Sequence, residues 1–250
     1  MFVIMFIIGT IFGSFYNVIG YRIPKNMSII YPSSHCTKCN HKLKFYELIP
    51  ILSYIFLKGK CKNCGKKISP FYPFFEFITG LLFSISYLSF GLNIELIISL
   101  TFISLLIIIT ISDCHYMIIP DEILIIFGSL LLTEKALIYG PNTIIKTLLN
   151  GFAAFIIMYM IKKIGDRLFK KESMGGGDIK LMFILGMVLD FPIAILSIFV
   201  GSFVGLPISL LSLKNNKEHI IPFGPFLSVG ALILHLMQIN TDMIIKYLTI

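Results

Sequence analysis

Long apolar segments are the feature that most limits what this chain can fold into. Of its 250 residues, 56% are hydrophobic and only 14% are charged, about half the charged share of a typical soluble domain. A helix of about twenty apolar residues crosses a bilayer, and in lipid only helices and closed barrels satisfy every backbone polar group. The sequence therefore predicts an all-α membrane helix bundle. Its eight expected spans cover residues 2–21, 72–90, 94–112, 121–138, 145–163, 178–190, 192–213 and 221–239.

Basic residues predict the orientation of this bundle. The segment from Arg22 to Pro70 contains ten Lys or Arg and one acid, Glu47. Basic loops beside membrane spans stay in the cytosol, and the basic residues of 162–171 and 214–217 then fall on the same side. A basic patch also occurs in nucleic-acid-binding proteins. Beside a membrane span, however, we expect anionic lipid as the partner and no nucleic acid.

Four cysteines divide this cytosolic segment into two CxxC turns. Cys36 and Cys39 form the first turn, and Cys61 and Cys64 the second, with 21 residues between the pairs. Two such turns complete a tetrahedral S₄ site, and disulfides are disfavoured in the cytosol. We expect structural zinc, with a redox dithiol pair and coincidence as the alternatives. The predicted domains are a first transmembrane helix (1–21), a loop domain (22–71) and a transmembrane bundle (72–250).

Two aspartates lie where expected spans meet the membrane surface. Asp113 follows the third span and Asp178 begins the sixth, after the glycine run 175–177. The Lys/Arg topology places both at the cytosolic face. Ionisable residues at a membrane border are costly and often functional, and two close carboxylates share one proton because both cannot ionise. The pair predicts aspartic-protease chemistry.

Three other polar residues have two possible roles each. Asp121, after Pro120, is expected to cap a helix first and to support catalysis second. Glu76, near the start of the second span, is as consistent with a favourable helix-dipole contact as with function. Asn17, inside the first span, needs a hydrogen-bond partner in lipid.

Together these segments resemble the type IV prepilin peptidases, integral membrane aspartic proteases with a GxGD motif. The resemblance extends along nearly the whole chain. It rests on Gly13-Ser14-Phe15, Leu48-Ile49-Pro50, the two CxxC pairs, Ser69-Pro70-Phe71, Asp113 with Ile119-Pro120-Asp121, Gly175-Gly176-Gly177-Asp178, and Ile221-Pro222-Phe223-Gly224-Pro225.

The resemblance implies an enzyme of the bacterial inner membrane with two activities. It would cleave short basic leaders from prepilins and pseudopilins at the cytosolic face, with Asp113 and Asp178 as the catalytic pair. It would then methylate the new N-terminal amine from S-adenosylmethionine. No G-x-G-x-x-G turn follows a strand pattern, so we expect no Rossmann-type site and assign no residue to the methyl donor.

Three other classes carry some of these features. A transporter would place its acids near mid-bilayer, within inverted repeats. A membrane thiol oxidoreductase would place CxxC toward the oxidising side. A presenilin-like GxGD protease would lack the cysteine loop between the first two spans.

The charge of the loop also bears on how a substrate would be recognised. A strongly basic loop repels a basic leader. We therefore expect attraction from the apolar substrate helix lying against the spans, with local help from Glu47 and Glu76. The loop charge would hold the cysteine module on anionic headgroups.

Overall fold

The computed structural model describes residues 1–214, 221–241, 243 and 246. These residues form nine α-helices, two short 3₁₀ helices and no β-strand, which confirms the all-α prediction. The elements are α1 (Phe2–Arg22), η1 (Ile23–Lys25), η2 (Phe45–Glu47), α2 (Leu52–Phe56), α3 (Phe71–Phe90), α4 (Glu95–Tyr116), α5 (Asp121–Tyr139), α6 (Thr143–Phe169), α7 (Gly176–Leu189), α8 (Phe191–Lys214) and α9 (Gly224–Leu236).

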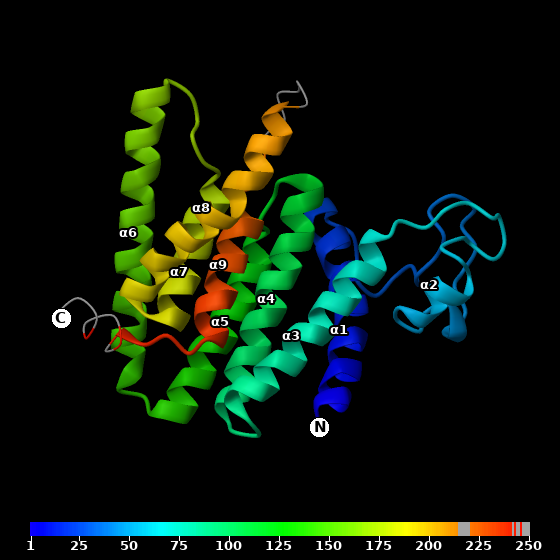
Figure 1. Ribbon diagram of the computed structural model, residues 1–250, viewed down its shortest axis with the longest axis horizontal. Coiled ribbons are helices and arrows are strands. Elements are labelled where there is room, and N and C mark those ends of the chain that lie inside the picture. The colour runs from blue at the N-terminus through cyan, green and yellow to red at the C-terminus, as the bar shows by residue number, and fades with distance from the viewer. Residues whose placement is uncertain (215–220, 242, 244–245, 247–250) are drawn as a thin grey trace.

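All the helices except α2 form one bundle in which successive helices alternate in direction (Figure 1). Helix α4 lies at its centre and packs against α1, α3, α5 and α9. Its side chains Phe102, Leu105, Ile108 and Ile109 are fully buried. A helix that is apolar on every face must be surrounded by other helices or by lipid, and here α4 is surrounded by helices.

The eight bundle helices coincide with the eight expected spans. Within the described part of the chain, five of them are long and apolar enough to cross a membrane: α1, α3, α4, α6 and α8. Helices α7 and α9 have only 14 and 13 residues, shorter than the roughly 20 that a span needs. Both are largely buried among the longer helices, so neighbouring helices surround them instead of lipid.

Glycines allow two pairs of bundle helices to touch backbone to backbone. A Cβ on Gly9 of α1 would lie 2.7 Å from the Cα of Gly80 in α3. A Cβ on Gly186 of α7 would lie 2.7 Å from the Cβ of Ala154 and from the carbonyl oxygen of Asn150, both in α6. Close approach through small residues is the usual way in which membrane helices associate.

The loop domain projects from one side of the bundle, between α1 and α3 (Figure 1). Its regular structure is limited to η1, η2, the single-turn helix α2 and two isolated bridges, His35–Lys42 and Lys60–Lys67, each of which closes a CxxC turn. The loop domain is itself the connection between α1 and α3. The other connections between bundle helices lie at the ends of the bundle.

Candidate active site

Asp113 lies in the last turn of α4, which continues to Tyr116 and ends at Met117 in a left-handed conformation (φ 55°). Its side chain is only 6% exposed. The backbone of Gly224, the first residue of α9, lies close to the Asp113 carboxylate. The carboxylate is therefore enclosed by α4 and by the amino end of α9.

Asp178 is the third residue of α7, and Gly175 is the N-cap of that helix. Its carboxylate lies beside the Gly175 backbone: a Cβ on Gly175 would be 3.5 Å from Oδ2. The side chain is 7% exposed, and Oδ1 is buried without a hydrogen-bond partner among the described residues. This leaves one oxygen of a buried carboxylate available for a proton or a water molecule.

The two carboxylates come together at the same end of the bundle. The charge of Asp113 acts on Asp178. Ile119, in the connection after α4, contacts a glycine beside each aspartate. A Cβ on Gly177, next to Asp178, would lie 2.8 Å from the Ile119 Cβ, and a Cβ on Gly224, beside Asp113, would lie 3.3 Å from its Cδ1. The sequence expectation that both acids share one face and one neighbourhood agrees with this arrangement.

Gly224 is a site residue that sequence reasoning missed. In the sequence, the stretch 221–225 contributed only to the family resemblance, and we assigned Gly224 no role at the site. A Cβ on Gly224 would lie 2.6 Å from Oδ2 of Asp113, too close for any side chain. The missing side chain allows the α9 backbone to approach the acid, and a glycine at a helix start beside the active face was the available signal.

Asp121 is neither a helix cap nor a buried partner of the aspartate pair. It is in the first turn of α5 but makes no side-chain capping hydrogen bond. Both of its oxygens instead accept from Lys180 Nζ, at 2.7 and 2.8 Å, and both side chains are more than half exposed. The ion pair joins the starts of α5 and α7, two residues after Asp178.

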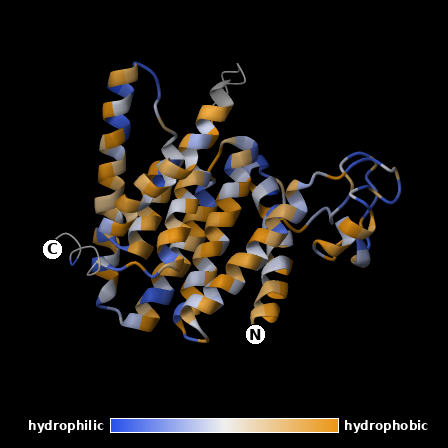
Figure 2. Ribbon diagram, viewed as in Figure 1, coloured by the Kyte–Doolittle hydropathy of each residue, from blue (hydrophilic) through white to orange (hydrophobic). Residues whose placement is uncertain are grey.

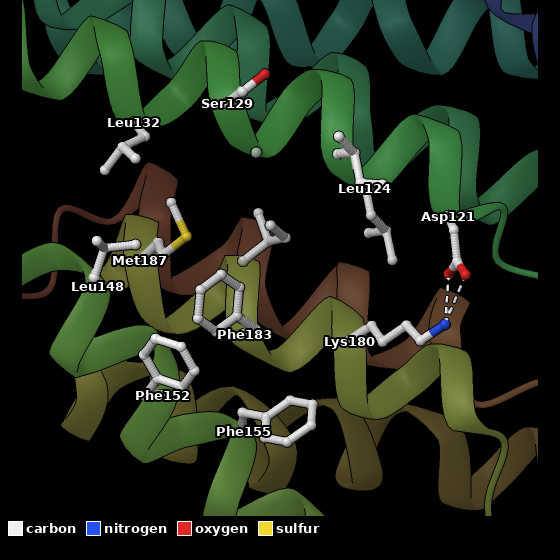
Figure 3. Close-up of a pocket in the computed structure, with 13 residues that line it drawn as sticks. Asp121, Leu124, Ser129, Leu132, Leu148, Phe152, Phe155, Lys180, Phe183 and Met187 are labelled. Atoms are coloured by element: carbon white, nitrogen blue, oxygen red, sulfur yellow. Dashed lines mark hydrogen bonds and ion pairs between the residues drawn. The ribbon is translucent and has the colours of Figure 1, made fainter.

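Two cavities meet at this ion pair. One, of about 370 Å³, lies between the end of α1 and the starts of α5 and α7; its lining includes Ile119, Gly176 and Gly177. The other, of about 540 Å³, is an apolar groove between α5, α6 and α7 (Figure 3). Asp121 and Lys180 line both. Figure 3 shows them at one end of the groove, with Phe152, Phe155 and Phe183 along its floor.

The four cysteines of the loop domain converge on one point. Their Sγ atoms all lie within 4.8 Å of one another; Cys36 and Cys64 are 4.0 Å apart, and Cys39 and Cys61 are 3.9 Å apart. A tetrahedral site with metal–sulfur bonds of about 2.3 Å has sulfur–sulfur separations of about 3.8 Å. The residues therefore fit a metal ion held by four thiolates.

Glu47 and Glu76 are both buried, at 6% and 8% exposure, which contradicts their expected use in leader recognition. Glu47 accepts from the Lys44 backbone amide at 2.8 Å and lies 3.3 Å from His41. The Lys44 hydrogen bond holds the pKa of Glu47 below its ordinary value. Both contacts are within the loop domain, so this acid stabilises the fold of the loop.

Glu76 is the sixth residue of α3 and lies outside its first turn. The expected favourable contact between this carboxylate and the positive end of the helix dipole is therefore also wrong. Its Oε2 accepts from the Ile51 amide at 2.7 Å, which attaches the loop domain to α3. Nearby, Asn17 Nδ2 donates to the Tyr72 carbonyl oxygen at 3.2 Å, so the NH₂ group of this amide has its expected partner. Its Oδ1 is buried without a hydrogen-bond partner among the described residues. The two polar residues join α1, α3 and the loop.

Two family models match most of the chain. The bacterial peptidase A24 N-terminal domain matches residues 7–90, which contain α1, the loop domain and α3. The type IV leader peptidase family matches residues 100–210, which contain both Asp113 and Asp178. The first match ends with α3 and the second begins inside α4. This central helix packs against α1 and α3 of the first match and against α5 of the second.

Curated relatives are similar along nearly the same length. A prepilin leader peptidase/N-methyltransferase of Bacillus subtilis (strain 168) is 39% identical over 237 residues, 93% of each chain. One from Myxococcus xanthus (strain DK1622) is 33% identical over 84% of this chain and 63% of its own length. One from Aeromonas salmonicida (strain A449) is 27% identical over 92% of this chain and 88% of its own length. No solved structure matches the chain.

Proposed function

Because the chain belongs to the type IV leader peptidase family, we propose that it removes leader peptides from type IV prepilins and pseudopilins. It does so at the cytosolic face of the bacterial inner membrane, by aspartic-protease chemistry. The observation that carries this proposal is the pair of buried carboxylates, Asp113 and Asp178, held at one end of the bundle within electrostatic range.

The two carboxylates divide the proton transfers of peptide hydrolysis. One takes a proton from the attacking water while the other, protonated, donates to the carbonyl oxygen of the scissile bond. The tetrahedral intermediate then collapses, its carbon–nitrogen bond breaks, and the leaving amine takes a proton from the pair. Burial supports this role, because it favours a state with one shared proton over two charged groups.

We place the apolar helix of the substrate in the groove between α5, α6 and α7. The groove is lined by apolar side chains except at the Asp121–Lys180 end, and there it joins the cavity that contains Gly176 and Gly177. A substrate whose apolar helix is preceded by a polar leader would change character at this junction. Its scissile bond would then be close to the glycine run before Asp178. A lipid acyl chain is the competing occupant.

The second activity is methylation of the new N-terminal amine from S-adenosylmethionine. The relatives named above are N-methyltransferases as well as peptidases, and the similarity to them includes the N-terminal third of the chain. We assign no described residue to the methyl donor. The donor supplies the methyl group when it is bound.

The cysteine cluster is proposed to hold structural zinc. Its sulfur separations fit a tetrahedral ion, and zinc is the usual ion of a Cys₄ site. The loop domain has little helix and few buried apolar side chains, so a metal would contribute much of its folding energy.

One experiment tests both activities. The purified protein is incubated with a prepilin, with and without S-adenosylmethionine, and the products are analysed by intact mass. We expect loss of the leader in both samples and one further methyl group only with the donor. An intact precursor in both samples would overturn the peptidase assignment, whereas cleavage without methylation would overturn only the second activity.

A further inference from the structure

The loop domain exposes an unusual concentration of large apolar side chains around α2. The most exposed are Phe45 (86%), Phe56 (80%) and Ile55 (61%). We call the whole set of exposed residues the apolar patch; it consists of Phe45, Tyr46, Leu48, Ile49, Leu52, Ile55 and Phe56. Soluble surfaces rarely leave such a run uncovered, and α2 buries none of its five residues.

Helix α2, which contains Leu52, Ile55 and Phe56 of the patch, lies at one side of the loop domain. In Figure 1, the bundle end with the start of α7 is at the top, and α2 lies below the rest of the loop domain. Figure 2 shows α2 as hydrophobic and the segments above it as mainly hydrophilic. In this view α2 therefore lies beside the apolar helices α1 and α3.

The charges around the patch are all of one sign. Four exposed lysines flank it in the sequence: Lys42, Lys44, Lys58 and Lys60. The acid inside the stretch, Glu47, is buried and hydrogen-bonded within the domain. A surface with exposed apolar side chains and surrounding cations suits an anionic lipid interface.

We propose that the apolar patch inserts into the cytosolic leaflet as a second membrane attachment of the protein, separate from the helix bundle. Phe45, Ile55 and Phe56 enter the boundary between headgroups and acyl chains, about 5–10 Å deep. The flanking lysines meet lipid phosphates. Lipid is the occupant, and not the substrate, because neither cavity near the aspartates is lined by any patch residue.

This insertion adds a function to the hydrogen bond between Glu76 and the Ile51 amide. That bond attaches the loop domain to α3 at a point inside the patch sequence. With one contact on the bundle and one surface in the lipid, the domain is held at two places. The cysteine cluster is thereby fixed beside the bundle. The inference does not depend on the catalytic roles of the aspartates.

The chain contains no tryptophan, so a single introduced tryptophan reports its own surroundings. Phe56→Trp places the probe in the patch, and Lys38→Trp, at an exposed polar position of the same domain, is the matched control. Each variant is reconstituted in phosphatidylglycerol-containing vesicles, with or without phosphatidylcholine brominated near the top of its acyl chains. We expect blue-shifted emission and strong quenching by the brominated lipid for Phe56→Trp, and neither for Lys38→Trp.

High salt separates insertion from electrostatic adhesion alone. Ionic strength near 1 M reduces the screening length to about 3 Å, so a domain held only by its lysines would leave the surface and lose its quenching. A patch inserted in the lipid should remain quenched at this ionic strength. Equal emission of the two variants, loss of quenching in salt, or quenching that ends when a substrate helix is added would each overturn the proposal. The same measurement on the Asp113→Asn protein separates it from failure of the proposed peptidase.

Discussion

The bundle buries most of the apolar side chains of its central helix, whereas the loop domain leaves most of those of α2 exposed. Helix α4 buries 14 of its 22 residues, whereas α2 buries none of its five. The bundle is stabilised by continuous helix packing. The loop domain depends on point attachments: a cysteine cluster, the buried Glu47 and the bond from Glu76 to Ile51. We therefore expect a substitution in the loop domain to affect only the loop domain, and a substitution in the bundle to lower the stability of the whole bundle.

The largest effect is expected at the aspartates, which would place the chemistry in the bundle alone. Asp113→Asn and Asp178→Asn should each reduce cleavage by about 10³-fold or more, since general acid–base groups contribute up to about 10⁴-fold. Cleavage of a purified prepilin measures this, and circular dichroism checks that each protein remains folded. Near-normal turnover of either folded variant would show that the pair is assigned wrongly.

Removal of the metal should separate the two regions most clearly. Cys61→Ser with Cys64→Ser, or treatment with a chelator, should unfold the loop domain, because metal binding in such modules is folding energy. The bundle should keep its helical signal. Proteolysis within residues 22–71 reports the loop, and circular dichroism reports the bundle. A matched loss of helix would contradict the independence of the regions, and unchanged proteolysis would contradict a structural metal.

Two glycines of α7 provide a matched pair in the bundle. Gly186→Ala should destabilise the protein by about 1–3 kcal/mol, the usual cost of overpacking, because the new Cβ meets Ala154 and the α6 backbone at 2.7 Å. Gly176→Ala has nothing within 4 Å and should leave thermal stability nearly unchanged. Comparable losses at both positions would show that contact with α6 does not explain the requirement for glycine at Gly186. Helix propensity would not explain such losses either, because alanine is the better helix former.

The attachment of the loop to α3 should be weaker and local. Glu76→Ala leaves the Ile51 amide without its acceptor, which costs about 1–3 kcal/mol when the amide stays buried. Glu76→Gln keeps an acceptor and should lose less. Hydrogen exchange of residues 48–52 measures the loosening. If Glu76→Gln instead raised KM only for Lys-rich leaders, the carboxylate would serve recognition after all.

The smallest effect on stability is expected at the exposed ion pair of α5 and α7. Asp121→Asn should change the free energy of unfolding by no more than about 1 kcal/mol, as exposed pairs do. Cleavage should fall far less than in Asp113→Asn. A complete loss of cleavage in a stable Asp121→Asn protein would give this residue a direct part in the chemistry.

The sequence was informative where one local property decides the outcome. Apolar runs predicted the eight bundle helices, the CxxC spacing predicted the cysteine cluster, and charge placed both aspartates at one end. Predictions from the sequence were wrong where the role of a side chain depends on which group it contacts. Glu47, Glu76 and Asp121 have the same carboxylate chemistry, yet two are buried on backbone amides and one is paired with Lys180.

The sequence by itself thus determined the all-α architecture, the residue types of the candidate site and the expectation that both aspartates lie at the same end of the bundle. The effects of hydropathy and charge depend on solvent and lipid. They can therefore be predicted without knowing which residues are in contact. Only the tertiary structure decided that Gly224 supports Asp113, that α7 and α9 are short buried helices, and that the α2 surface stays uncovered. Each of these depends on which helices meet, a set of contacts between residues far apart in the chain.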